Sequence, residues 1–176
     1  MSTKINVKKH MIVGICFFLL SAIPVLFSMY FAKPALNLSE MIENENINDL
    51  SLTIYYLSPY TYMLYPVSNV EDLSHRCEEK IVINGSDLEK HIDLFKQIGN
   101  DDLKPVIWKS SDLDLRLYYV LESKKNGKLF DVAMWGKDDD SMIVSGYEAK
   151  GNNIFINVII PFLPEDKAKS LENFIL

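Results

Sequence analysis

The longest uninterrupted apolar stretch of the chain covers residues 11–32, and no charged residue falls inside it. Lys4, Lys8 and Lys9 come just before it. At about 1.5 Å per residue, a helix of this length crosses a hydrocarbon core about 30 Å thick. Because lysine is favoured on the cytoplasmic side of a membrane, residues 1–10 are expected in the cytoplasm. We predict a single-pass anchor at 11–32 in the cytoplasmic (inner) membrane, in contact with the lipid bilayer.

A cleaved secretory signal is the alternative for this stretch. Signal cleavage needs small residues three positions and one position before the cut. Tyr30 and Lys33 occupy the upstream position at the two candidate cuts, after Ala32 and after Ala35. The pattern therefore favours an uncleaved anchor.

The chain after the anchor divides into a polar, acidic segment, 33–49, and a longer segment, 50–176, with the pattern of a folded domain. We predict a partly helical stalk for the first and one extracytoplasmic domain for the second. Residues 50–57 and 112–122 alternate between apolar and polar, which is typical of strands with one buried and one wet face. In the second strand, the residues expected to face the core are Leu113, Leu115, Leu117, Tyr119 and Leu121.

Turn signals separate four successive strand patterns, so a meander is expected in the second half of the domain. Its strands cover 112–122, 128–135, 141–149 and 153–162. Asn126-Gly127 favours a type I′ hairpin turn, because both residue types tolerate positive φ. A short apolar stretch at 80–84 indicates a further strand.

Helical patterns occupy three places in the domain. Residues 69–78 follow a capping-box pair, and residues 86–98 repeat apolar residues at helical intervals. The third helix begins at Pro164, whose fixed φ suits a first turn. The predicted fold class is therefore α+β: an N-terminal single transmembrane helix, then one domain with a mainly antiparallel sheet in the order strand, helix, four-stranded meander and C-terminal helix. The helices are expected to pack on one face of the sheet.

Charge and cysteine content narrow the choice of partner. Four of the 18 basic residues and none of the 24 acidic residues precede position 36, which leaves a charge of −10 on the remainder. This argues against nucleic acid and favours another protein, of basic character, as the partner. Cys77 is the only cysteine after the anchor, so no internal disulfide is expected there. A domain outside the cytoplasm without a disulfide frame favours a bacterial envelope protein.

Candidate chemistry is sparse. His75 and Cys77 are two residues apart on a predicted helix, which points their side chains in different directions. Residues 138–140 are three consecutive aspartates, but neither glycine nor glutamate follows at the spacing that completes a calcium loop, and a solvated turn is favoured. No phosphate loop, nucleophile elbow or zinc motif is present in the sequence. We predict no catalytic residue, cofactor or metal ligand.

Tyrosine is concentrated in one segment, since five of the nine tyrosines fall within residues 55–65. Tyrosine supplies a large, stiff contact area with a polar end, so it is favoured at interfaces. Trp135 is out of phase with the core residues of its strand and is expected on the wet face, together with the polar residues of 112–122. The predicted partner-binding residues are Tyr55, Tyr60, Tyr62, Tyr65, Trp135, Asp112, Asp114 and Arg116.

These features together predict a membrane-anchored, extracytoplasmic and non-enzymatic protein-binding module. An immunity or inhibitor protein of the bacterial envelope that neutralises a toxin fits the acidic surface, by analogy. A structural or sensory subunit of a membrane protein complex is the alternative. A cell-envelope hydrolase is a third hypothesis, which would need converging carboxylates or a paired His75 and Cys77.

Overall fold

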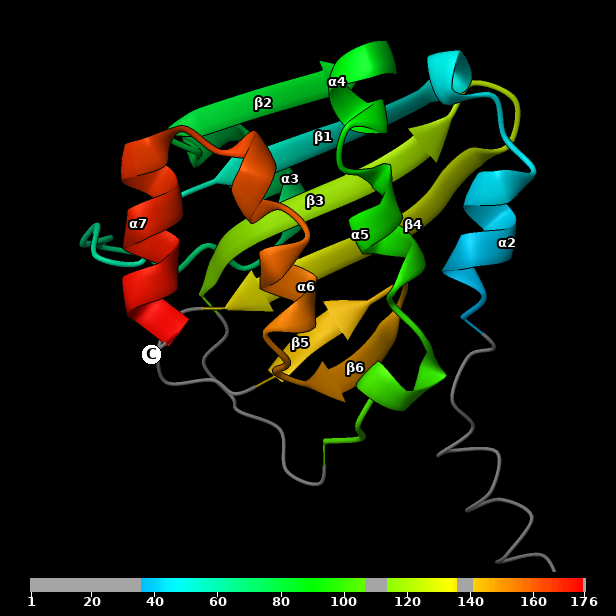
Figure 1. The fold of residues 1–176 in the computed structure, drawn as a ribbon. Coiled ribbons are helices and arrows are strands. Elements are labelled where there is room, and N and C mark those ends of the chain that lie inside the picture. The colour runs from blue at the N-terminus through cyan, green and yellow to red at the C-terminus, as the bar shows by residue number, and fades with distance from the viewer. Residues whose placement is uncertain (1–35, 107–113, 136–140, 176) are drawn as a thin grey trace, which may run out of the picture. The chain divides into compact units, whose positions relative to one another are not determined.

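The centre of the structure, a computed structural model, is a six-stranded antiparallel sheet with the order β2-β1-β3-β4-β5-β6 (Figure 1). The structure describes residues 36–106, 114–135 and 141–175. The strands are β1 (Leu50–Tyr56), β2 (Glu79–Asn84), β3 (Leu115–Ser123), β4 (Gly127–Trp135), β5 (Ser141–Val144) and β6 (Tyr147–Lys150). The helices are α2 (Leu38–Glu43), α3 (Val70–Arg76), α4 (Gly85–Glu89), α5 (Ile92–Lys96), α6 (Ile154–Asn157) and α7 (Glu165–Ile175), with 3-10 turns η1 (Ile47–Asp49), η2 (Asn100–Asp102) and η3 (Ile160–Phe162).

Alternate residues of β4 belong to two separate hydrophobic clusters. Val132 and Met134 lie in the larger one, and Ala133 and Trp135 lie in the smaller one. Because successive side chains of a strand point to opposite faces, the two clusters occupy the two faces of the sheet.

The larger cluster, which we call the main core, is covered by helices. Figure 1 shows α5, α6 and α7 in front of the sheet, and each helix contributes buried residues to the cluster. Phe95 of α5 and Phe155 of α6 pack around Tyr119 and Phe130 of the sheet, with ring centroids 6.2–6.4 Å apart. The Tyr119 hydroxyl donates to the Phe155 carbonyl at 2.6 Å, and burial raises the pKa of this tyrosine well above its usual value. The core thus satisfies this buried hydroxyl internally.

The smaller cluster, which we call the second core, lies under α3 and the segment that connects β1 to it. Its buried residues are Leu57, Val67, Leu73, Leu115, Ala133 and Trp135. Figure 1 shows α3 behind the sheet, on the side away from α5 and α7. The prediction that all helices pack on one face is therefore wrong for α3. A short helix suffices there because only part of this face is covered.

Several predicted elements are confirmed. Strand β1 matches the alternation at 50–57, and α7 begins directly after Pro164. Helix α3 is capped by Asn69, whose side chain accepts a hydrogen bond from the Asp72 amide at 2.8 Å. The helix expected at 86–98 is present as two short helices, α4 and α5, separated at residues 90–91.

The β3–β4 hairpin is present, but its turn differs from the predicted type. Among Asn126 and Gly127, only the glycine has positive φ, at 70°. The strand register shifts between Leu121 and Glu122. A two-residue type I′ turn needs positive φ at both central positions, so the turn is not of this type. The register shift leaves Leu129 unpaired on the β4 side.

Two of the predicted meander strands are wrong. Residues 141–149 form the hairpin of β5 and β6, in which Ser145 and Gly146 take positive φ of 48° and 81°. Residues 153–162 form α6 and η3 instead of a strand. A nearly continuous apolar run fits a buried helix as well as a buried strand. Here the Asn152 side chain accepts from the Ile154 amide at 3.2 Å and favours the helical start.

A β-bulge at Arg116 changes the face assignment of β3. Leu115 pairs with Trp135 and Leu117 pairs with Met134, so one extra residue sits on the β3 side. The predicted common face of Leu115 and Leu117 is therefore wrong: Leu117 lies in the main core and Leu115 in the second core. Such a bulge re-aims the inserted side chain and bends its strand.

The predicted transmembrane helix needs a correction. None of the helices in the described ranges is both long and apolar enough to cross a bilayer. Helix α7 has 11 residues, which corresponds to about 16 Å against the roughly 30 Å of a hydrocarbon core. The fold class with a membrane span and the inner-membrane localisation are not retained. Residues 11–32, where the anchor was predicted, lie outside the described residues.

The segment predicted as an acidic stalk contributes to the core where it is described. Leu36, Leu38 and Ile42 are buried in the main core. The Leu36 amide donates to the Asn100 side chain at 2.7 Å, and the Asn37 side chain caps α2. From residue 36 onward this segment is thus folded against the sheet.

Candidate functional site

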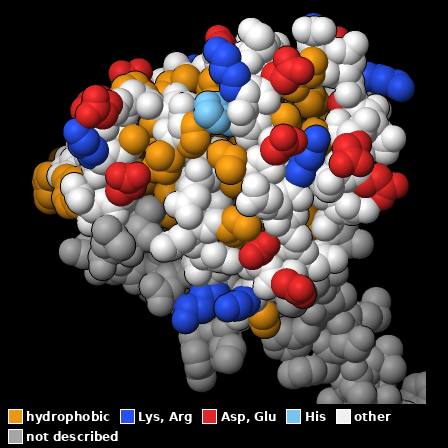
Figure 2. All heavy atoms as spheres, viewed as in Figure 1, with side chains coloured by type: hydrophobic (Ala, Val, Ile, Leu, Met, Phe, Trp, Pro, Cys, Tyr) orange, Lys and Arg blue, Asp and Glu red, His pale blue; other side chains and the backbone are white. Residues whose placement is uncertain are grey.

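A group of exposed aromatic and aliphatic side chains lies on residues 58–67, which we call the tyrosine loop. It connects β1 to α3. Four large hydrophobic residues of the loop are exposed, namely Tyr60, Tyr62, Leu64 and Tyr65. Tyr62 is 86% exposed, the highest value among them. Hydrophobic side chains protrude in Figure 2 at the left margin, where Figure 1 shows this loop projecting from the molecule.

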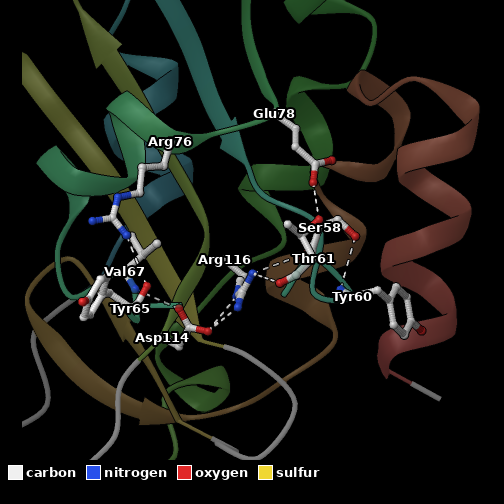
Figure 3. Close-up of polar contacts among 9 residues, drawn as sticks. All are labelled: Ser58, Tyr60, Thr61, Tyr65, Val67, Arg76, Glu78, Asp114 and Arg116. Carbon is white, nitrogen blue, oxygen red and sulfur yellow. Dashed lines mark hydrogen bonds and ion pairs between the residues drawn. The ribbon is translucent and has the colours of Figure 1, made fainter. Parts of the chain in front are cut away.

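Arg116, which is buried between the sheet and the loop, hydrogen-bonds the loop backbone. One guanidinium nitrogen, Nη1, donates to the Ser58 carbonyl at 3.2 Å and to the Thr61 carbonyl at 2.8 Å (Figure 3). Arg116 is only 8% exposed, and its Nε and Nη2 pair with Asp114. The ion pair neutralises a guanidinium that would otherwise be buried with its charge uncompensated. The bulge in β3 supplies the side chain that ties the first half of the loop.

Asp114 and Leu115 hold the second half of the loop. The Asp114 Oδ1 atom accepts from the Val67 amide at 2.9 Å, and the Leu115 amide donates to the Val67 carbonyl at 2.7 Å. Leu57, directly before the loop, donates its amide to the Arg116 carbonyl at 2.8 Å. Both ends of the loop are thus attached to the same short stretch, residues 114–116, at the start of β3.

Two side chains outside β3 add further attachments. Glu78 accepts from the Thr61 hydroxyl and from Lys167 of α7, the latter at 3.3 Å. Burial raises the pKa of Glu78, but these two hydrogen bonds, the charge of Lys167 and a backbone hydrogen bond from Ser58 together hold the pKa below its usual value. Arg76 of α3 donates to the Tyr65 carbonyl at 3.2 Å. The loop therefore turns the carbonyl oxygens of Ser58, Thr61, Tyr65 and Val67 towards the body of the domain.

Apolar residues complete the underside of the loop. Leu57 and Val67 are buried in the second core, and Met63 packs against it. Figure 3 shows Tyr60 on the side of α7 and Tyr65 on the side of Arg76, so the exposed rings are spread along the loop. The result is a short segment with a fixed backbone and an apolar, aromatic outer surface.

The predicted site residues separate into three groups in the structure. Tyr60, Tyr62 and Tyr65 are exposed on the loop. Tyr55 lies on the sheet itself, with Lys80 Nζ 5.2 Å from its ring centroid and the Tyr118 ring 6.0 Å away. Asp112 lies outside the described residues.

The third group is buried beneath the loop. Trp135 lies on the predicted face but is 8% exposed, so the prediction of an exposed tryptophan is wrong. The loop and α3 cover it, because Leu57, Val67 and Leu73 pack in the same cluster. Asp114 and Arg116 likewise face the loop backbone. These three residues position the surface rather than form it.

The predicted partner-binding residues do not include Leu64, Thr61, Glu78 or Arg76, although Leu64 lies in the tyrosine-rich segment that the sequence singled out. The exposure of Leu64 could have been predicted, because it lies between tyrosines in a loop that follows a proline. The pattern of that loop indicates no buried position for it. The other three act on backbone oxygens or on one another across 11 to 17 residues, and no local pattern marks such contacts.

Other candidate chemistry finds no support in the geometry. Burial raises the pKa of Cys77, whose thiol donates to the Ser74 carbonyl at 3.6 Å, whereas a thiolate nucleophile needs a lowered pKa. Within the described ranges, no group of three His, Cys, Asp or Glu side chains is placed to hold a metal ion. Residues 138–140 lie outside those ranges.

Comparisons with known proteins find no relative of this chain. The chain matches no protein-family model, and no match is found among curated proteins or among solved structures. The predicted immunity function therefore has no related protein behind it and is not retained. The site must be interpreted from its own geometry.

Proposed function

We propose that the chain is a protein-binding module whose contact surface is the tyrosine loop. The observation that carries the proposal is that four exposed large apolar side chains stand on a backbone tied to the buried Arg116. Large apolar side chains that are exposed together on one short segment are typical of interaction sites.

The fixed backbone supports binding by lowering its entropic cost. Ordering a flexible side chain at an interface costs about 0.5–1.5 kcal/mol, and ordering a loop costs more. Tyrosine has only two side-chain torsions, so it loses little freedom on contact. In the tyrosine loop, Ser58, Thr61, Tyr65 and Val67 are already hydrogen-bonded through their backbones. The loop therefore resembles a pre-organised contact surface rather than a mobile connection.

The charge around the loop is balanced. Arg116 pairs with Asp114, Arg76 with Asp72 and Lys167 with Glu78. Contacts by the loop itself are therefore expected to depend little on salt, while the net charge of −6 favours approach of a basic protein. A basic partner stays a prediction, and the salt dependence of the association rate tests it.

The first experiment places a photo-crosslinking amino acid at Tyr62 in cells that naturally express the chain. The matched control carries the same group at Lys125, which is exposed in the β3–β4 turn. We expect a discrete protein adduct from position 62 that position 125 does not give. Equal adducts from both positions contradict the proposal.

The second experiment uses the crosslinked protein in purified form. Tyr62→Ala and Leu64→Ala should each weaken its affinity by about tenfold or more, since exposed side chains at the centre of an interface carry most of the binding energy. Lys125→Ala should bind as the wild type does. Unchanged affinity in both loop variants contradicts the assignment of the loop as the contact surface.

A further inference from the structure

The two outer strands of the sheet differ in what covers their free edges. Along β6, the Lys150 amide donates to the Lys104 carbonyl at 2.7 Å, and Pro105 forms a bridge with Ala149. Along β2, no strand or isolated bridge from the described parts of the chain pairs with the outer edge. Figure 1 shows β2 as the outermost strand, with α4 starting at its carboxyl end. Within the described residues, the outward backbone donors and acceptors of β2 therefore have no partner strand.

Of the features that usually protect an exposed edge, strand β2 has neither a proline nor a bulge. Its sequence is EKIVIN, and all six residues pair with β1 without a register shift. Its one lysine, Lys80, reaches back over the sheet and places Nζ 5.2 Å from the Tyr55 ring centroid. This cation–π contact holds the positive charge over the neighbouring strand.

The side chains of β2 leave apolar surface beside this edge. Val82 is 54% exposed, and it is the one exposed large hydrophobic residue outside the tyrosine loop among the described residues. Ile81 and Ile83 point to the other face, where they pack partly against the main core. A strand added at this edge would cover all three residues.

We propose that β2 pairs with β2 of a second copy of the chain, antiparallel and about a two-fold axis that passes through Val82. In this register Val82 faces Val82 of the copy, Ile81 faces Ile83, and Lys80 faces Asn84. Apolar residues meet apolar residues, and no like charges are opposed. An axis through Lys80 would instead oppose two lysines.

The pairing joins the two sheets into one and extends the main core through the isoleucines. The same surface of each copy is used, so the interface closes on itself as a dimer. The tyrosine loop takes no part in it. The inference is therefore independent of the proposed function.

Sedimentation of the full chain over about a hundredfold range of concentration tests the dimer, because its population follows mass action. We expect the mean mass to rise from that of one 20.2 kDa chain towards twice this value. Val82→Lys should stay monomeric, because it opposes two charges at the axis. Asn157→Lys, which adds the same charge at an exposed position of α6, should dimerise as the wild type does.

If the wild type stays monomeric at every concentration, the proposal is overturned. This holds even if the β2 edge binds a strand of another protein. Dimerisation of Val82→Lys overturns it as well. Residues 1–35 are common to all variants, so association through them cannot produce the difference. Far-UV circular dichroism verifies that both variants fold.

Oxidative crosslinking tests the register. Across the axis the two Val82 Cβ atoms lie about 5 Å apart, within reach of a disulfide, whereas the two Lys80 residues are separated by about 13 Å along the strands. Val82→Cys should form a covalent dimer that the wild type and Lys80→Cys do not form. Equal crosslinking of both variants overturns the proposed axis.

Discussion

The two faces of the sheet are closed by different kinds of interaction. On the helical face, buried aromatic and aliphatic side chains from α2, α4, α5, α6 and α7 pack in one continuous cluster. On the opposite face, a few residues are buried under α3 and the tyrosine loop, and a guanidinium holds the loop backbone. One face is stabilised by a large buried cluster, whereas the other combines a smaller buried cluster with polar ties to main-chain oxygens.

Because of this difference, the residues that stabilise the fold are not the residues exposed for contact. The helical face in Figure 2 mixes hydrophobic and charged side chains, and its large aromatic residues are buried. The loop face instead exposes its tyrosines because their backbone is secured without their side chains. Residues that stabilise the fold and residues available to a partner thus lie on different elements.

The largest effect is expected from the main core. Phe130→Ala should lower the free energy of unfolding by about 3–5 kcal/mol, because it removes a fully buried ring and leaves a cavity between Tyr119 and Phe155. Urea denaturation measures the change. If Phe130→Ala lowers the free energy of unfolding by less than Arg116→Met does, the stated difference between the two faces is contradicted.

A smaller effect is expected from the tie between sheet and loop. Arg116→Met keeps the aliphatic stem but leaves Asp114 and the Ser58 and Thr61 carbonyls without their donor, at a cost of about 1–3 kcal/mol. The loop should also become a preferred site of cleavage by chymotrypsin. Resistance equal to that of the wild type contradicts the anchoring role of Arg116.

Acid should loosen the loop through Glu78. Its pKa in the folded chain is held below the unfolded value, so the stabilisation is present above the unfolded pKa and is lost as the pH falls through the folded pKa. Chymotrypsin cannot serve at low pH, so hydrogen exchange of the Thr61 region between about pH 3 and 6 is the measurement. Glu78→Gln should show a flatter pH dependence, and a profile identical to that of the wild type contradicts this assignment.

The smallest effect on stability is expected from Tyr62. Because its side chain is 86% exposed, Tyr62→Ala should change the free energy of unfolding by less than about 0.5 kcal/mol. Urea denaturation beside the Phe130 variant provides the comparison. A loss above about 1 kcal/mol would mean that the ring packs on the fold and is not available to a partner.

The sequence predicted those parts of the fold in which a local pattern is complete. Strand β1 has clean alternation, α7 has a proline start, and the hairpin at Gly127 has a strong turn signal. Residues 153–162 failed because a run of apolar residues has no periodicity that separates a strand from a buried helix. Ser145-Gly146 was missed as a turn because its flanking strands are only four residues long.

The site was predicted only in part for a related reason. Tyrosine clustering is visible in composition, and it located Tyr60, Tyr62 and Tyr65. The bulge that inserts Arg116 breaks the alternation of β3 without any glycine or proline to mark it. Trp135 was assigned to the correct face of the sheet. Its burial could not be predicted, because it depends on a loop about 70 residues earlier in the chain that covers this face.

Arg116 recognises the main chain of residues 58 and 61, not their side chains. The identities of Tyr60, Tyr62, Leu64 and Tyr65 are therefore largely decoupled from the shape of the segment that carries them. A library randomised at these four sites should keep the parent architecture in most members. The domain would then be a scaffold on which new specificities are selected by diversifying a single short stretch.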